Sequence, residues 1–396
     1  MRGVRSLATL GLLALACASA PPPRPSPAVA GEGEKGAARG SAAAEGDKGT
    51  GSPSAAGEKG AGPARELRIE EPLVVESGRE DLELAGKNDE ELFAVGTAAY
   101  AAGDHRRAAA AFARLADLFP RSPRLPTALF DAGLAYERTS EWRLALERFR
   151  ALAGGFTGPD ADEAAFRSAE CLYNLRQLAE ARALLDGLAA RKDLALPEHL
   201  RALVQRGVVE LEAGDREAAE RSLRLATSAW QDAKGREELD DYYPAQAQFY
   251  LGELYRGHFQ AIQLRPEAGD EARLGRDLEA KAEMLLSAQG HYLRAIKVGN
   301  PQWTVAAGAR IGELYDELHA QLTGAPLPPG LDAEHARAYR AELARKVRVL
   351  VTKAIGIYEQ TLAAARRTGV DNEWVERTRR ALERMRAAVA EGYSGS

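Results

Sequence analysis

The sequence is poor in the residues that form metal centres and disulfides. Its 396 residues include two cysteines and six histidines, and no two histidines lie three to five positions apart. Two cysteines cannot form a disulfide framework or a cysteine-rich zinc site, and widely separated histidines do not form a local metal-binding motif. We therefore expect no metal centre and no disulfide-stabilised fold.

A surplus of positive charge is also lacking. The chain has 53 Lys and Arg against 58 Asp and Glu, which gives a formal net charge of −5. Proteins that bind nucleic acid neutralise phosphates with basic residues, so nucleic acid is not an expected partner. The sequence also has no HExxH, phosphate-loop, GxSxG or Ser-x-x-Lys motif. These absences favour a protein that is not an enzyme and uses no cofactor.

The one long apolar run lies at the N-terminus. It spans Leu7 to Ala16, follows Arg2 and Arg5, and ends just before Cys17. Ten residues in a helix cover only about 15 Å, which is half of a bilayer core of about 30 Å. The pattern predicts a signal peptide over residues 1–16 and not a permanent membrane span.

Cys17 follows Ala14-Leu15-Ala16, and this segment resembles the lipobox of bacterial lipoproteins. The resemblance implies that cleavage leaves Cys17 as a lipid-modified N-terminus that anchors the chain in a membrane. Ala18, in place of aspartate, resembles an address for the outer membrane, which implies a lipoprotein facing the periplasm. The alternative is an ordinary secreted protein that is cleaved near Ala16 or Ala20.

Residues 17–65 form a low-complexity segment of Ala, Gly, Pro, Ser, Glu and Lys. Val29 is the only sizeable apolar side chain between Pro21 and Arg65. Such a segment cannot offset an ordering entropy of about 1–2 kcal/mol per residue, so we expect a disordered tether. Residues 66–88 then lead into the folded body.

A repeat of helical pattern begins at residue 89. Four segments, which begin at Asp89, Pro126, Asp162 and Leu200, are spaced by 37, 36 and 38 residues. Their eighth residue is small: Gly96, Gly133, Ala169 and Gly207. Twelve residues later each has alanine, and four further on each has a large apolar residue: Ala108 and Phe112, Ala145 and Phe149, Ala181 and Leu185, Ala219 and Leu223. A small residue on one helix and an alanine on the next allow two helices to approach closely.

This pattern of a small residue, an alanine and a large residue resembles the tetratricopeptide repeat (TPR), which has about 34 residues per unit. The resemblance implies an all-α fold, a solenoid of helical hairpins, with regular units over residues 89–235. Gly103-Asp104 and Gly214-Asp215 fall where a turn must join the two helices of a unit. Cys171, on the first helix of the third unit, is expected to be a small buried side chain.

The second half, residues 236–396, departs from the regular spacing. First-helix patterns around Gly252 and Gly312 find their partner alanines at Ala288 and Ala354, which implies about 24 and 30 added residues. We expect two units with elongated helices and a loop at residues 324–330. Two helix starts are marked, by Asn300-Pro301 and by Asn372 before Trp374. The final segment, 373–391, is expected to be a capping helix with a narrow apolar stripe: Trp374, Thr378, Leu382, Met385 and Val389.

The TPR resemblance also implies a peptide-binding groove lined by the first helices. The residues it assigns to that groove are Phe93, Tyr100, Phe130, Glu137, Arg138, Phe166, Glu170, Tyr173, Asn174, Val204, Phe249 and Glu253. The charged residues at groove positions are nine acids and three bases: Glu90, Glu137, Arg138, Glu163, Glu170, Arg201, Glu212, Glu253, Arg256, Glu313, Asp316 and Glu317. This balance predicts a protein or peptide partner with apolar anchors and basic residues. The alternative is that the phenylalanines only pack neighbouring first helices together.

Taken together, the sequence predicts a non-enzymatic scaffold that is anchored in the bacterial cell envelope. By resemblance to TPR lipoproteins, it would serve the assembly of outer-membrane, secretion, pilus or motility machinery. The alternative is a glycan-binding or enzymatic site in the expanded second half. Trp303, Trp374 and the loop at residues 324–330 are its only indications.

Overall fold

The computed structural model of the chain describes residues 83–233, 240–264, 271–328 and 330–394. Within these ranges the ordered elements are thirteen helices, α3 to α15, and no strand is present. The first eight are short: α3 Asp89–Ala101, α4 His105–Leu118, α5 Leu125–Arg138, α6 Trp142–Gly155, α7 Pro159–Asn174, α8 Leu178–Ala190, α9 Leu196–Glu212 and α10 Arg216–Ala233. The last five are longer: α11 Tyr242–Ala261, α12 Glu271–Val298, α13 Pro301–Gly324, α14 Ala333–Thr368 and α15 Glu373–Ser394.

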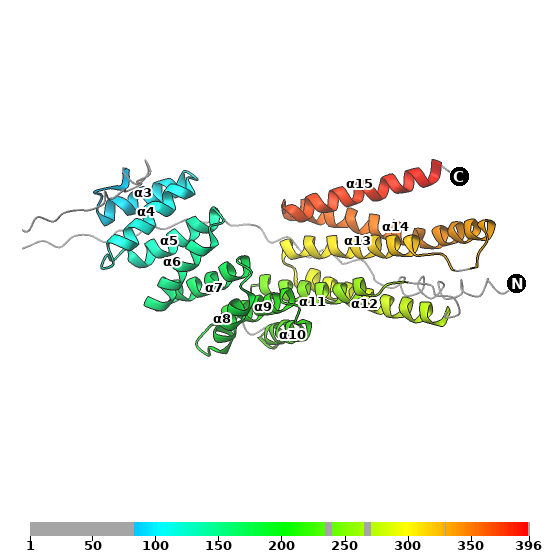
Figure 1. The fold of residues 1–396 in the computed structure, drawn as a ribbon, viewed down its shortest axis with the longest axis horizontal. Coiled ribbons are helices and arrows are strands. Elements are labelled where there is room, and N and C mark those ends of the chain that lie inside the picture. Colours follow the sequence, from blue (N-terminus) through cyan, green and yellow to red (C-terminus); the bar gives the residue numbers. More distant parts are fainter. Residues whose placement is uncertain (1–82, 234–239, 265–270, 329, 395–396) are drawn as a thin grey trace, which may run out of the picture.

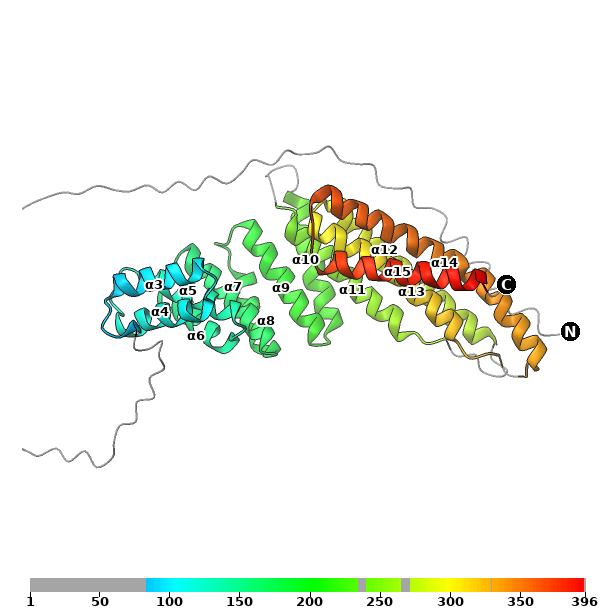
Figure 2. The same cartoon turned by 90° about the horizontal axis from the view of Figure 1, so that it is seen from above.

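Consecutive helices pack as antiparallel neighbours, and the pairs stack into an elongated, bent array (Figure 1). The short helices α3 to α10 form one half of the array, and the long helices lie side by side in the other half (Figure 2). The prediction of an all-α solenoid of helical hairpins is confirmed.

The turns within the regular units form where the sequence predicts them. Gly103 and Gly214 have φ values of +79° and +84°, a left-handed conformation that glycine adopts at low cost. The aspartates that follow cap the next helices. Asp104 accepts a hydrogen bond from the backbone N–H of Arg107, and Asp215 accepts one from that of Ala218, each at 3.1 Å.

The small residue at the eighth place of a unit makes room for the large residue on the second helix. A Cβ atom added to Gly96, Gly133 or Gly207 would lie less than 3 Å from a side-chain carbon of the large residue in its own unit. These distances are 2.6 Å to Phe112, 2.4 Å to Phe149 and 2.7 Å to Leu223. The helices of a pair therefore approach so closely that only glycine fits beside these side chains.

The same contact recurs in the two expanded units. A Cβ atom on Gly252 would lie 2.4 Å from the Tyr292 ring, and one on Gly312 would lie 2.2 Å from the Tyr358 ring. The contacting pair is separated by 16 residues in the regular units but by 40 and 46 residues here, so 24 and 30 residues have been added. Helices α12 and α14, of 28 and 36 residues, contain most of this addition. The predicted elongation is confirmed.

The predicted helix starts and the capping helix are also confirmed. The Asn300 side chain accepts from the backbone N–H groups of Gln302 and Trp303 at the start of α13. Helix α13 ends at Gly324 and α14 begins at Ala333, with residue 329 of the expected loop outside the described residues. Helix α15 packs on α13 and α14 through a buried stripe of Val375, Thr378, Ala381, Leu382 and Met385.

The predicted signal peptide (1–16), Cys17, the tether and most of the lead-in segment lie outside the described residues. Among the helices that the structure does describe, none combines the length and the apolar character needed to cross a membrane.

Candidate peptide-binding surface

The first helices of the units form one continuous surface, which we call the inner wall. It consists of α3, α5, α7, α9, α11 and α13. Helix α5 contacts α7, and helices α9, α11, α13 and α15 contact one another in that order. Residues at corresponding places of successive units therefore lie next to one another along the wall.

The predicted apolar residues of the wall divide into two groups. Phe166, Val204 and Phe249 are only 1%, 0% and 3% exposed, so they pack between helices and do not face a partner. For these three the groove assignment is wrong and the packing alternative holds. Phe93 and Phe130 are half-buried, and each meets the large residue of its own unit edge to face, with ring centroids 5.6 Å and 5.8 Å apart.

The remaining uncharged residues assigned to the groove lie nearer the solvent. Tyr100 is half-buried against His105, with ring centroids 5.0 Å apart, and Tyr173 is also half-buried. Asn174 is exposed and donates to the backbone carbonyl of Glu170 at 2.9 Å. Leu134, which the sequence analysis did not assign, is half-buried on α5. The partly accessible apolar side chains of the wall thus include Phe93 and Tyr100 on α3 and Phe130 and Leu134 on α5.

The predicted surplus of negative charge is offset by arginines from neighbouring helices. Glu137 on α5 accepts from Arg167 on α7 at 2.7 Å, and Glu170 on α7 accepts from Arg201 on α9 at 3.0 Å. Burial raises the pKa of Glu137, and the Arg167 guanidinium opposes that rise. The sequence count left out arginines such as Arg167, which lie between the assumed groove positions and pair with these acids.

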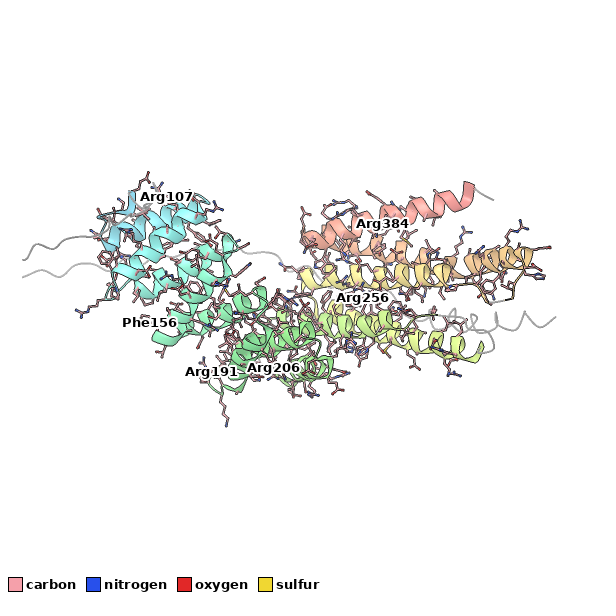
Figure 3. The ribbon with its side chains drawn as sticks, viewed as in Figure 1. Arg107, Phe156, Arg191, Arg206, Arg256 and Arg384 are labelled. Atoms are coloured by element: carbon pink, nitrogen blue, oxygen red, sulfur yellow. The ribbon has the colours of Figure 1, made fainter. Side chains whose placement is uncertain are left out.

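A denser charge network joins the last two helices of the inner wall, α11 and α13, to α15. Arg310 on α13 donates to Glu253 on α11 at 2.9 Å and to Glu313 on its own helix at 2.6 Å. Arg377 on α15 donates to the other oxygen of Glu313 at 2.6 Å. Arg256, labelled in Figure 3, pairs with Glu317. Side-chain exposure is only 12% for Arg310, so this network is largely screened from water.

The alternative of a glycan-binding or enzymatic site depended on Trp303, Trp374 and the loop at residues 324–330. The loop lies far from the two tryptophans. Trp303 packs on Phe249 with centroids 5.0 Å apart, and Trp374 lies between the guanidinium groups of Arg310 and Arg377, at 4.8 Å and 5.3 Å. Both rings lie near the start of α13, while the loop follows its end, about 36 Å away along a helix of 24 residues. Glu253 and Glu313, which bind the arginines beside Trp374, are paired with arginine.

The predicted burial of Cys171 is confirmed. Cys171 is fully buried, and burial raises the pKa of its thiol to about 12, so the thiol stays protonated at neutral pH. Among the described residues, no group of three or more His, Cys, Asp or Glu side chains is arranged to hold a metal ion.

Antiparallel helix pairs stacked in register, with glycine and a large side chain in contact within each pair, define an α-solenoid repeat protein. A family model for the tetratricopeptide repeat matches residues 92–122, which cover most of α3 and α4. The first helical hairpin of the chain therefore matches the tetratricopeptide repeat. No curated protein matches the sequence.

Three solved structures illustrate the likeness. A tetratricopeptide repeat protein from Parabacteroides merdae is 13% identical, with a TM-score of 0.35, covering 75% of this chain and 98% of that chain. A TPR repeats protein from Bacteroides fragilis is 14% identical, with a TM-score of 0.29 and coverage of 59% and 98%. A Rap protein complexed with competence and sporulation factor is 15% identical, with a TM-score of 0.36 and coverage of 76% and 76%.

Proposed function

We propose that the chain is a non-enzymatic scaffold that binds a protein partner on its inner wall while a lipid at Cys17 holds it in the bacterial outer membrane, facing the periplasm. Its partner would belong to an assembly machine for outer-membrane proteins, secretion, pili or motility. The observation that carries the binding part of the proposal is the row of half-buried apolar side chains on α3 and α5: Phe93, Tyr100, Phe130 and Leu134.

Apolar anchoring supports this proposal better than charge does. Fully burying one large apolar side chain of the partner contributes about 1.5–3 kcal/mol, and a few such anchors dominate the affinity of most interfaces. The acids of the wall already have arginine partners, as at Glu137 and Glu170, so a basic partner gains less from them than the sequence predicts.

The wall proposal predicts a selective loss of binding. Phe93→Ala combined with Phe130→Ala removes two apolar contacts, and we expect at least tenfold less partner in crosslinking from native envelopes, since each lost anchor costs about 1–2 kcal/mol. The matched control is Leu118→Ala with Leu225→Ala, because these leucines are exposed on the second helices α4 and α10. Circular dichroism checks that both variants keep their helices. Equal losses in both variants, or retained crosslinking in the first, would show that the partner binds elsewhere.

The anchoring proposal has a separate test. Cys17→Ala removes the only residue that the lipobox resemblance offers for acylation, so we expect the protein to move from the membrane fraction to the soluble fraction. Mass spectrometry of the mature wild-type N-terminus should show a cysteine that carries acyl chains. A wild-type chain that begins beyond residue 17 contradicts lipidation and favours ordinary secretion.

A further inference from the structure

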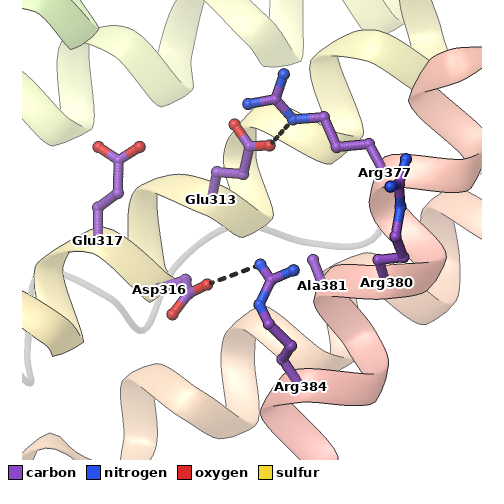
Figure 4. A pocket seen from close by; sticks show the side chains of 7 residues that line it. All are labelled: Glu313, Asp316, Glu317, Arg377, Arg380, Ala381 and Arg384. Carbon is purple, nitrogen blue, oxygen red and sulfur yellow. Dashed lines mark hydrogen bonds and ion pairs between the residues drawn. The ribbon is translucent and has the colours of Figure 1, made fainter.

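A cavity of about 430 Å³ lies between α13 and α15, at the C-terminal end of the inner wall. Its lining residues are Glu313, Asp316, Glu317, Arg377, Arg380, Ala381 and Arg384. Figure 4 shows the acids projecting from α13 and the arginines from α15. The three acids occupy wall positions, so the cavity is continuous with the surface that carries the proposed function.

The acids of this cavity have little capacity left for a ligand. Glu313 accepts from Arg310 and from Arg377, both at 2.6 Å. Glu317 points away from α15 and is bound by Arg256 and Gln260. Each of these two carboxylates is therefore already neutralised within the chain.

Two arginines keep most of their donors unused. Within the described residues, the Arg380 side chain donates from Nε to the backbone carbonyl of Glu376 on its own helix, at the long distance of 3.4 Å. Arg384 lies 3.9 Å from Asp316, too far for a hydrogen bond, and its side chain is 66% exposed. Both arginines line the cavity from α15: in Figure 4 the Arg384 side chain extends toward Asp316, and the Arg380 side chain extends toward Arg377.

We propose that this cavity binds a carboxylate of an acidic segment in the partner protein, with Arg380 and Arg384 donating to its oxygens. Guanidinium groups match a carboxylate with paired hydrogen bonds, which gives orientation as well as charge complementarity. Asp316 opposes the ligand, because its own carboxylate competes for Arg384. This inference rests on the proposed function of the inner wall, and it gives that wall a charged end at α13, opposite the end that carries the apolar part on α3 and α5.

The test uses the full-length protein and a fluorescently labelled oligo-glutamate peptide, with oligo-lysine of equal length for comparison. Arg380→Gln with Arg384→Gln should weaken oligo-glutamate binding about tenfold, the loss expected for charge-assisted hydrogen bonds. Asp316→Asn should instead tighten it several-fold, since it removes the competing charge. The matched control, Arg366→Gln with Arg367→Gln, removes two exposed arginines at the end of α14 and should leave the affinity within about twofold.

Three results would overturn the inference. One is an equal loss in the Arg366/Arg367 control, which indicates general electrostatic attraction. The second is preferential binding of oligo-lysine, weakened by Asp316→Asn. The third is displacement of oligo-glutamate by millimolar inorganic phosphate but not by acetate, which assigns the cavity to a phosphate group. In each case the Phe93/Phe130 crosslinking experiment still decides the proposed function on its own.

Discussion

Gly312→Ala is expected to destabilise the C-terminal half by roughly 1–3 kcal/mol, the usual cost of overpacking a core. The new methyl group would lie 2.2 Å from Cε1 of Tyr358, a ring that is fully buried. Neither the ring nor the backbone of α13 can move without disturbing the packing of α14, which lies along it. Urea denaturation followed by tryptophan fluorescence measures the loss, because Trp303 and Trp374 report on this half of the protein.

Tyr358→Leu should relieve that overpacking. The third regular unit already combines Ala169 with Leu185 at the corresponding places, so alanine and leucine form a compatible pair. Tyr358→Leu alone leaves a cavity and should cost about 2–4 kcal/mol, but the double variant should cost clearly less than the sum of the two single changes. Gly356→Ala is the control. It has open space around it in α14, so we expect no loss and a gain of up to about 1 kcal/mol. Strict additivity of Gly312→Ala and Tyr358→Leu would mean that the two sites do not share one contact.

The fold was predictable because the residues that make the contact between the two helices of a unit, a small residue and a large one, recur along the sequence. A glycine and an aromatic residue still meet where 24 or 30 residues have been added between them within a unit, as at Gly252 and Tyr292. Local signals such as Asn300-Pro301 then fix where helices begin. Periodicity, turn residues and the repeat thus specify the hairpins without any knowledge of long-range contacts.

The candidate surface was less predictable, because burial and pairing depend on how adjacent units are rotated. The same repeat place is occupied by half-buried Phe130 and by fully buried Phe166, whose ring is covered by the Arg201 guanidinium 4.5 Å from its centroid. The arginines that pair with the acids of the wall lie at repeat positions where the residue type differs from unit to unit. Lys281 was also not predictable from the sequence, because no motif marks it. It is fully buried, and it donates to the backbone carbonyls of Phe259 and Ile262 at the end of α11.

Arg310→Met should have the largest effect of any single change considered, about 3–5 kcal/mol. Arg310 binds Glu253 and Glu313, whose side chains are only 17% and 13% exposed, and methionine would leave both carboxylates without this partner in a poorly hydrated site. The loss should appear as early unfolding of the long helices in urea, with faster hydrogen exchange in α11, α13 and α15, the three helices that the network joins.

A triple variant separates charge from packing. Glu253→Gln and Glu313→Gln, added to Arg310→Met, remove the two buried charges that lose Arg310 as a partner, so most of the lost stability should return. Arg386→Met is the control, because its ion pair with Glu359 is exposed and should contribute no more than about 1 kcal/mol. If Arg310→Met costs no more than Arg386→Met, the network does not hold the long helices together. If the triple variant stays as unstable as the single one, the contribution of Arg310 comes from its contact with Trp374 instead.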